Sequence, residues 1–198
     1  MQLTGKQIVE EGLVTNFVPE AIQQQGMDVR LMKVRRFGHR AEPGKDINGP
    51  KWEKNFHFGE IGFIPAYGKT VLPLSEEIPV TKIGSAADRD IMGWILDPGY
   101  YEVIFDEGVK MPNNRVMVLI SRSSAVRCGA FIECGQFDAG FNTDHMGCFF
   151  HVDERIAIEE HARIAQLRFT TTEEVQSDDM YNGQWQNDKQ RQEQQKVA

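Results

Sequence analysis

The segment 121–129 gathers hydroxyl and guanidinium groups directly after an apolar run. Arg122 and Arg127 supply paired donors suited to phosphate oxygens, and Ser123 and Ser124 add hydroxyl groups. If a helical turn begins at Ser123, its free backbone amides face the same point. The segment therefore predicts a polyphosphate site, while a serine-rich helix cap without a ligand is the commoner explanation of such a stretch.

The segment 135–141 places Asp138 between aromatic residues and directly before Ala139 and Gly140. A partly desolvated carboxylate can orient and deprotonate a water molecule, and the neighbouring Phe141 can pack against a sugar ring. An aspartate before small residues is also an ordinary turn former. Taken alone, this segment leaves both interpretations open.

Two further segments place polar side chains inside apolar strands. Asp28 enters a strand two residues after Gly26, and Gln166 lies on an apolar strand that follows a Glu-His-Ala corner at 160–162. Neither segment predicts chemistry by itself.

Short apolar runs separated by turns predict the framework that positions these segments. Thr4 caps a short N-terminal helix, and residues 38–60 are polar and turn-rich, which predicts a long loop or hairpin insertion. Residues 84–90 are expected to form a loop, and the strand at 116–121 to be buried on both faces. Strands are predicted at 27–37, 61–64, 71–74, 80–83, 100–105, 109–111, 116–121, 130–134, 148–152, 156–158 and 164–169. Their even spacing predicts an all-β sandwich or barrel.

Composition excludes several functional classes. The 198 residues carry 22 basic and 29 acidic side chains, a formal net charge of −7, and their composition is that of one globular domain. An acidic balance argues against non-specific binding to nucleic acid or anionic membranes. No apolar run approaches the roughly 20 residues of a membrane span, and the N-terminus has no signal-peptide core, so a cytoplasmic location is expected.

Three cysteines, Cys128, Cys134 and Cys148, form no CxxC pair. Small reduced thiols on strands are the expected state. Because His145 and His151 flank Cys148, a zinc cluster is the alternative.

The end of the chain has a different composition. Residues 173–198 are acidic and then Gln-rich, and the last dozen are expected to be disordered. Tyr181 and Trp185 stand out in this polar segment and indicate either an anchor to a neighbouring surface or a lid over a ligand.

In chain order, the four polar segments resemble the motifs of the dUTPase and dCTP deaminase superfamily. The matching stretches are 26–31, 122–124, 138–141 and 163–167, and the resemblance runs from residue 3 to about residue 186. It implies a dUTPase-like β-barrel or jelly-roll-like subunit with a short N-terminal helix, which forms a homotrimer with active sites at subunit interfaces. We place this β domain at 1–172 and a C-terminal lid segment and tail at 173–198.

Within the superfamily the chain is most similar to archaeal-type dUTPases. The deaminase branch uses a glutamate on the strand after the third motif, whereas residues 146–152 contain no carboxylate and the position falls on Cys148 or Val152. The ending 181–186 is similar to the Tyr–x–Gly–x–aromatic–Gln segment of archaeal-type dUTPases.

The resemblance implies hydrolysis of dUTP, or a related deoxypyrimidine nucleoside triphosphate, to the monophosphate and pyrophosphate. Asp138 would activate the water that attacks the α-phosphorus, and Mg²⁺ would bridge the phosphates, with Asp28 acting on it through water. No nucleic acid or membrane partner is expected. The substrate-binding residues that the resemblance implies are Arg122, Ser123, Ser124, Arg127, Phe141, Gln166, Tyr181, Gln184 and Gln186.

Two departures from the family pattern keep alternatives open. Phe141 stands where the third motif normally has Tyr, and Thr143 replaces a Gly, which leaves the preferred base open. A dCTP deaminase, alone or bifunctional, would need a carboxylate from elsewhere, such as Glu133 or Glu102. A nucleotide-binding regulatory trimer without catalysis is the third alternative.

Overall fold

The structure is a computed structural model that describes residues 1–37, 64, 66, 70, 75–183, 185 and 186. The insertion predicted at 38–60, the strand at 71–74, nearly all of the strand at 61–64, Gln184 and the last twelve residues therefore lie outside the described residues. The described elements are α1 (Gly5–Glu10), β1 (Val14–Thr15), η1 (Pro19–Ala21), β2 (Ile22–Gln23), β3 (Gly26–Phe37), β4 (Ser75–Glu77), β5 (Thr81–Ala86), β6 (Arg89–Leu96), β7 (Gly99–Phe105), β8 (Gly108–Lys110), β9 (Arg115–Ser121), α2 (Ser123–Arg127), β10 (Ala130–Glu133), β11 (Gln136–Phe137), β12 (Asn142–Thr143), β13 (Gly147–Val152), β14 (Ile156–Glu159), β15 (Arg163–Thr171) and η2 (Ser177–Asp179).

The N-terminal helix begins where the sequence predicts. The Thr4 hydroxyl accepts a hydrogen bond from the Gln7 backbone amide, and the Gln7 side chain accepts one from the Thr4 amide. This reciprocal pair satisfies two backbone donors at the start of α1, which has no preceding turn to pair with them. Ile8 is fully buried and fixes the helix against the sheet.

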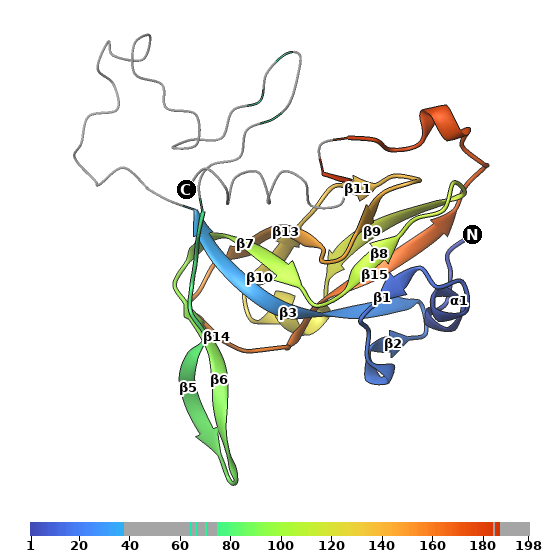
Figure 1. The fold of residues 1–198 in the computed structure, drawn as a ribbon. Coiled ribbons are helices and arrows are strands. Elements are labelled where there is room, and N and C mark those ends of the chain that lie inside the picture. The colour runs from blue at the N-terminus through green and yellow to red at the C-terminus, as the bar shows by residue number, and fades with distance from the viewer. Residues whose placement is uncertain (38–63, 65, 67–69, 71–74, 184, 187–198) are drawn as a thin grey trace, which may run out of the picture.

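The long strand β3 organises the sheet. Its first half pairs with β15 and its second half with β7, and irregular register near Leu31 bends it between the two (Figure 1). The main sheet runs in the order β10-β13-β7-β3-β15-β9-β11, with β2 and β4 also paired to β3. This curled, all-β arrangement confirms the predicted fold class.

The two ends of the curled sheet meet behind β3. The amide of Ile132 on β10 donates to the Ser121 hydroxyl at the end of β9 over 2.7 Å. Because β10 and β9 lie near opposite ends of the strand order, this bond closes the sheet in the manner of a barrel. Met117, Leu119 and Phe150 point into the enclosed core and are almost fully buried.

Two expectations about the strands are wrong. Residues 84–90 form the outer end of the β5–β6 hairpin, which projects from the body and turns at residues 87–88 (Figure 1). Its strands leave most side chains exposed, so the sequence carries no apolar alternation there. The strand β9 is buried on one face only within a single chain, since Val118 is 37% exposed.

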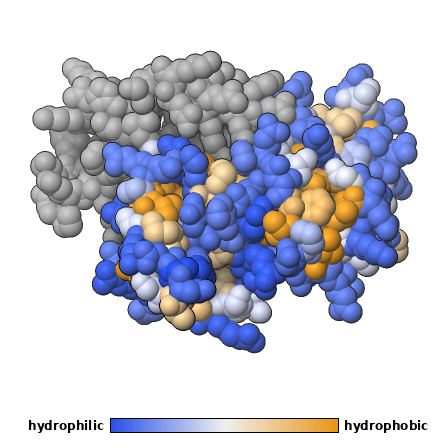
Figure 2. All heavy atoms as spheres, turned by 60° about the horizontal axis from the view of Figure 1, so that its bottom comes forward, coloured by the Kyte–Doolittle hydropathy of each residue, from blue (hydrophilic) through white to orange (hydrophobic). Residues whose placement is uncertain are grey.

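Several apolar side chains remain on the surface. Figure 2 shows apolar patches between the hydrophilic side chains on one face of the molecule. Exposed large apolar residues include Ile95, Tyr100, Val118, Val126 and Phe149. Contiguous apolar surface of this kind is typical of a face that contacts another macromolecule. Among the described residues no helix is long and apolar enough to cross a membrane.

Candidate active site

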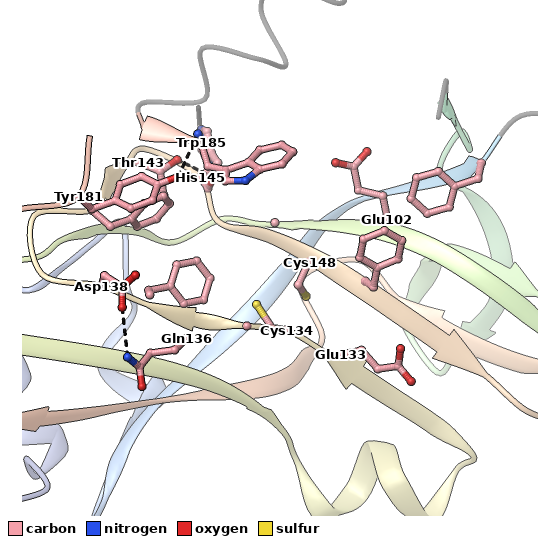
Figure 3. A pocket seen from close by; sticks show the side chains of 16 residues that line it. Glu102, Glu133, Cys134, Gln136, Asp138, Thr143, His145, Cys148, Tyr181 and Trp185 are labelled. Carbon is pink, nitrogen blue, oxygen red and sulfur yellow. Dashed lines mark hydrogen bonds between the residues drawn. The ribbon is translucent and has the colours of Figure 1, made fainter. Parts of the chain in front are cut away.

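A cavity of about 350 Å³ opens between the loop-rich stretch 135–149 and the chain segment that follows Met180 (Figure 3). Strands β10, β11, β12 and β13, together with the loops that connect them, supply most of its wall. Its lining residues are Phe37, Glu102, Glu133, Cys134, Gly135, Gln136, Phe137, Asp138, Phe141, Thr143, His145, Gly147, Cys148, Phe149, Tyr181 and Trp185.

Asp138 lies on this wall directly after β11. Its side chain is exposed, and Gln136 Nε2 donates to Asp138 Oδ1 over 3.1 Å. One amide donor orients the carboxylate, and the remaining lone pairs of the two oxygens are left to accept from a water. The structure thus places the predicted catalytic carboxylate at a cavity, in contact with solvent.

An aromatic wall stands next to Asp138. The Phe141 ring lies 5.1 Å from Phe137 and 5.4 Å from Tyr181, measured between ring centroids. Burial raises the pKa of Tyr181, and the nearby Asp138 charge acts in the same direction. The phenol is therefore neutral near pH 7, and its oxygen accepts a hydrogen bond from the Trp185 amide over 3.1 Å.

Residues 180–183, 185 and 186 are docked onto the loop-rich stretch that carries Asp138. The Tyr181 amide donates to the Ala139 carbonyl over 2.8 Å. The Gln186 side chain accepts from the Asn142 amide and donates to the Gly140 carbonyl, each over 2.8 Å. Gln186 therefore holds this segment in place, and Tyr181 and Trp185 reach the cavity from it.

The second predicted group of site residues gathers around Asp28. This carboxylate is 1% exposed, and its Oδ2 lies 3.2 Å from Arg122 Nε and 3.5 Å from Arg163 NH1. Gln166 Nε2 donates to Asp28 Oδ1 over 3.5 Å, because Gln166 and Asp28 are direct partners in the β15–β3 pairing. Burial raises the pKa of Asp28, and the charges of Arg122 and Arg163 oppose that rise. We call these four residues the Asp28 cluster.

The Asp28 cluster holds Arg122 at the start of α2. Arg122 NH1 donates to the Arg163 carbonyl over 2.9 Å, and α2 begins at the next residue, Ser123, so the helical turn considered from the sequence is present. Ser123, Ser124 and Arg127 on α2 are exposed. The buried, ion-paired geometry of Asp28 favours a role in positioning Arg122, and its indirect role toward a metal stays a prediction.

The structure does not bring the two groups of residues together within one chain. None of Asp28, Arg122, Ser123, Ser124, Arg127 and Gln166 lines the cavity that Asp138 lines. Sequence reasoning assigned no role to Gln136 and no role of its own to Arg163, which begins the fourth motif, whereas Trp185 was expected to be an anchor or part of a lid. For Gln136 the available signal was its position two residues before Asp138, which puts both side chains on one side of the strand.

The far end of the cavity carries two carboxylates. Glu133 is exposed, whereas Glu102 is 9% exposed and lies 3.4 Å from Arg35 Nε, with Ser75 Oγ donating to it. Both were named from the sequence as possible carboxylates of a deaminase, and both line the cavity.

The predicted location of the thiols on strands holds for Cys148 alone among the three cysteines. Cys148 on β13 is buried and Cys134 is half-buried after β10, whereas Cys128 is exposed at the end of α2. Over the described ranges, no group of three or more His, Cys, Asp or Glu side chains could hold a metal ion.

Comparisons with known proteins agree with the fold and the motifs. A family model described as dCTP deaminase-like matches residues 2–172. A protein of Methanosarcina acetivorans named probable deoxyuridine 5′-triphosphate nucleotidohydrolase is 35% identical over 134 residues, which are 65% of this chain and 75% of that protein. One of the same name from Methanococcoides burtonii is 34% identical over 99 residues, 48% of this chain and 57% of that protein.

The chain thus spans little more than half the length of some curated relatives that it matches. Among solved structures, the 2′-deoxycytidine 5′-triphosphate deaminase from Agrobacterium tumefaciens superposes with a TM-score of 0.52 at 16% identity. That alignment covers 85% of this chain and 47% of the deaminase, and it supports the fold alone. With the family model matching most of its length, the chain belongs to the dCTP deaminase-like family, which the four sequence motifs predict.

Proposed function

We propose that this protein is a nucleotide hydrolase that converts dUTP, or a related deoxypyrimidine triphosphate, to the monophosphate and pyrophosphate. The observation that carries the proposal is Asp138, an exposed carboxylate oriented by Gln136 on the wall of a cavity. The names of the curated relatives support dUTP as the substrate.

The reaction needs a water, a base and a leaving group. Asp138 accepts a proton from the water as its oxygen bonds to the α-phosphorus, and the bond from that phosphorus to the β-phosphate oxygen breaks. Pyrophosphate leaves with the bridging oxygen. The ring of Phe141, 7% exposed at the cavity wall, packs against the deoxyribose, and Tyr181 adds a second ring beside it.

The triphosphate needs permanently cationic donors, and the described lining residues of the Asp138 cavity include no Lys or Arg. We assign that role to Arg122, Arg127, Ser123 and Ser124 of a neighbouring subunit, because these donors are grouped on and before α2 of each chain. A homotrimer with sites at its interfaces would join the two halves. The exposed apolar residues Val118 and Val126, which lie on β9 and α2, favour contacts between copies there.

Mg²⁺ fits this arrangement because it keeps most of its water shell and binds triphosphate oxygens, so that few protein ligands are needed. Asp138 is the exposed carboxylate nearest the aromatic wall and would meet that shell. When bound, the ion would neutralise phosphate charge. We expect EDTA to remove turnover and added Mg²⁺ to restore it.

The test is a pyrophosphate-release screen with dUTP, dCTP, dTTP and 5-substituted deoxypyrimidine triphosphates in the presence of Mg²⁺. The proposal predicts release from dUTP or a 5-substituted analogue, and much less from the ribonucleotide UTP. Binding of dUTP without release of pyrophosphate from any of these substrates would contradict it and favour a regulatory binding protein.

Deamination of dCTP is a second candidate, because Glu133 lines the cavity without an ion-pair partner among the described residues. A carboxylate there can pass a proton from an attacking water to the leaving ammonia. The same screen is read for ammonia from dCTP, with Glu133→Gln as the variant. Ammonia release that is lost in this variant would establish the second activity.

A further inference from the structure

Cys134 and Cys148 occupy facing positions on neighbouring antiparallel strands. The β10–β13 pairing runs from Ala130 opposite Val152 to Glu133 opposite Phe149, so the next step places Cys134 opposite Cys148. Directly opposite residues of antiparallel strands have Cα atoms about 4.5 or 5.5 Å apart. Disulfides span Cα separations of about 4.4–6.8 Å, so this position suits one without movement of the strands.

Both side chains point into the same space. Figure 3 shows both cysteine side chains in the wall of the cavity, between Asp138 and Glu133. Cys148 is 8% exposed and Cys134 is half-buried, so the cavity is their route to small solutes.

The two thiols are chemically different. A hydrogen bond from Cys148 lowers the pKa of Cys134, burial acts in the opposite direction, and the Gly135 backbone amide adds to the lowering. The thiolate is the reactive form of cysteine, so the lowered pKa favours Cys134 as the attacking sulfur, and Cys148 on the neighbouring strand can resolve the product.

We propose that Cys134 and Cys148 are a redox-sensitive pair that closes to a disulfide in the cavity wall when a peroxide enters. The Cys134 thiolate attacks one oxygen of hydrogen peroxide, the O–O bond breaks, and hydroxide leaves and becomes water. Cys148 then attacks the sulfenic sulfur, the S–S bond forms, and a second water leaves. The two sulfurs lose two electrons in total, and the two peroxide oxygens gain them.

Closing the disulfide changes the nucleotide site, a consequence that rests on the proposed function. The bond ties the strand end before Asp138 to β13 and removes both thiols from the cavity wall. We expect oxidation to lower dUTP turnover several-fold, and dithiothreitol to restore it.

The test counts thiols, which does not depend on nucleotide chemistry. The full chain is treated with hydrogen peroxide, denatured, alkylated with N-ethylmaleimide and weighed by mass spectrometry. In the reduced chain, N-ethylmaleimide should label all three cysteines. In the oxidised chain it should label Cys128 alone, and the remaining mass should be lower by two hydrogens, as a disulfide requires. Peptide mapping should find Cys134 linked to Cys148.

Matched variants separate the outcomes. Cys128→Ser should still form the disulfide and leave no thiol to label, whereas Cys134→Ser and Cys148→Ser should form none and keep turnover after mild oxidation. Labelling of all three cysteines after peroxide treatment, or a covalent dimer through Cys128 in place of the internal bond, would overturn the proposal. A chain that forms the bond but hydrolyses no deoxypyrimidine triphosphate contradicts the proposed function and supports the redox pair.

Discussion

At the scale of single residues, Asp28 illustrates how a buried carboxylate holds a neighbouring arginine side chain in position. Its carboxylate lies within 3.5 Å of two guanidinium groups and has almost no exposed surface. Sequence reasoning identified Asp28, Arg122 and Gln166 as site residues from separate segments. Their contact depends on the register of β3 and β15, which pairs Asp28 with Gln166 although the two are separated by 138 positions in the chain. No local sequence pattern encodes that register.

The raised pKa of Asp28 predicts a pH-dependent stability. A folded-state pKa above the ordinary value means that the folded chain binds this proton more tightly than the unfolded chain. Between the ordinary value of 3.8 and the raised pKa, its contribution to the free energy of unfolding therefore falls as the pH rises. The free energy of unfolding, measured with urea across that pH range, gives a slope against pH. We expect Asp28→Asn to lose the part of this slope that Asp28 contributes.

Burial also raises the pKa of Glu107. This residue is present in both proteins, so its contribution to the pH dependence cancels when they are compared. Asp178→Asn, a change at an exposed side chain, is the matched control and should keep the wild-type slope. An unchanged slope in Asp28→Asn would show that the cluster does not hold this proton.

At the scale of elements, the strands and both short helices were largely predictable because their apolar runs are bounded by Gly, Pro and Asn. The outer end of the β5–β6 hairpin was not, since most residues from 84 to 92 face solvent and carry no apolar alternation. The docking of residues 180–186 was predicted only as a possible lid. Its contacts, such as the hydrogen bond from the Gln186 side chain to the Gly140 carbonyl, hold it beside the loop that follows Asp138.

Gly140 is the residue that lets this segment dock. It has a φ of +86°, and an added Cβ would lie 2.9 Å from Met180 Cβ and 3.2 Å from the Tyr181 amide nitrogen. We expect Gly140→Ala to displace the segment, to expose Tyr181 and Trp185 to chymotrypsin, and to lower kcat/KM at least tenfold.

Gly12→Ala provides the control, because Gly12 has a φ of +65° but no neighbour within 4 Å of an added Cβ. The free energy of unfolding of this variant should fall by about 1–2 kcal/mol, because alanine is strained at a positive φ, and the segment should stay docked. Equal protease sensitivity in the two variants would contradict the steric argument.

At the scale of the whole molecule, the net charge of −7 coexists with a local basic group at Arg122 and Arg127. The single chain separates this group from the Asp138 cavity, so the proposed site depends on assembly. Sequence resemblance alone implied a trimer; the separation of the two groups gives that expectation a structural reason.

A shared site predicts complementation between two inactive variants. Asp138→Asn and Arg122→Ala should each lose turnover. Trimers co-assembled from equal amounts of the two variants should regain about a quarter of wild-type activity, because about one site in four then combines an intact Asp138 from one subunit with an intact Arg122 from its neighbour. Light scattering checks the trimer. If the mixture stays inactive although mixed trimers form, each site lies within one chain.

Asp138→Asn tests the central claim most directly. The amide keeps the size of the side chain but cannot take a proton from water, a loss worth about 10²–10⁴-fold in rate for a general base. Asp144→Asn changes an exposed carboxylate six residues further along the chain, outside the cavity lining, and should behave as wild type. The measurement is the rate of pyrophosphate release from dUTP, with dUTP affinity measured in parallel: we predict loss of turnover in Asp138→Asn with affinity within about tenfold of wild type, and near-normal turnover in that variant would contradict the account.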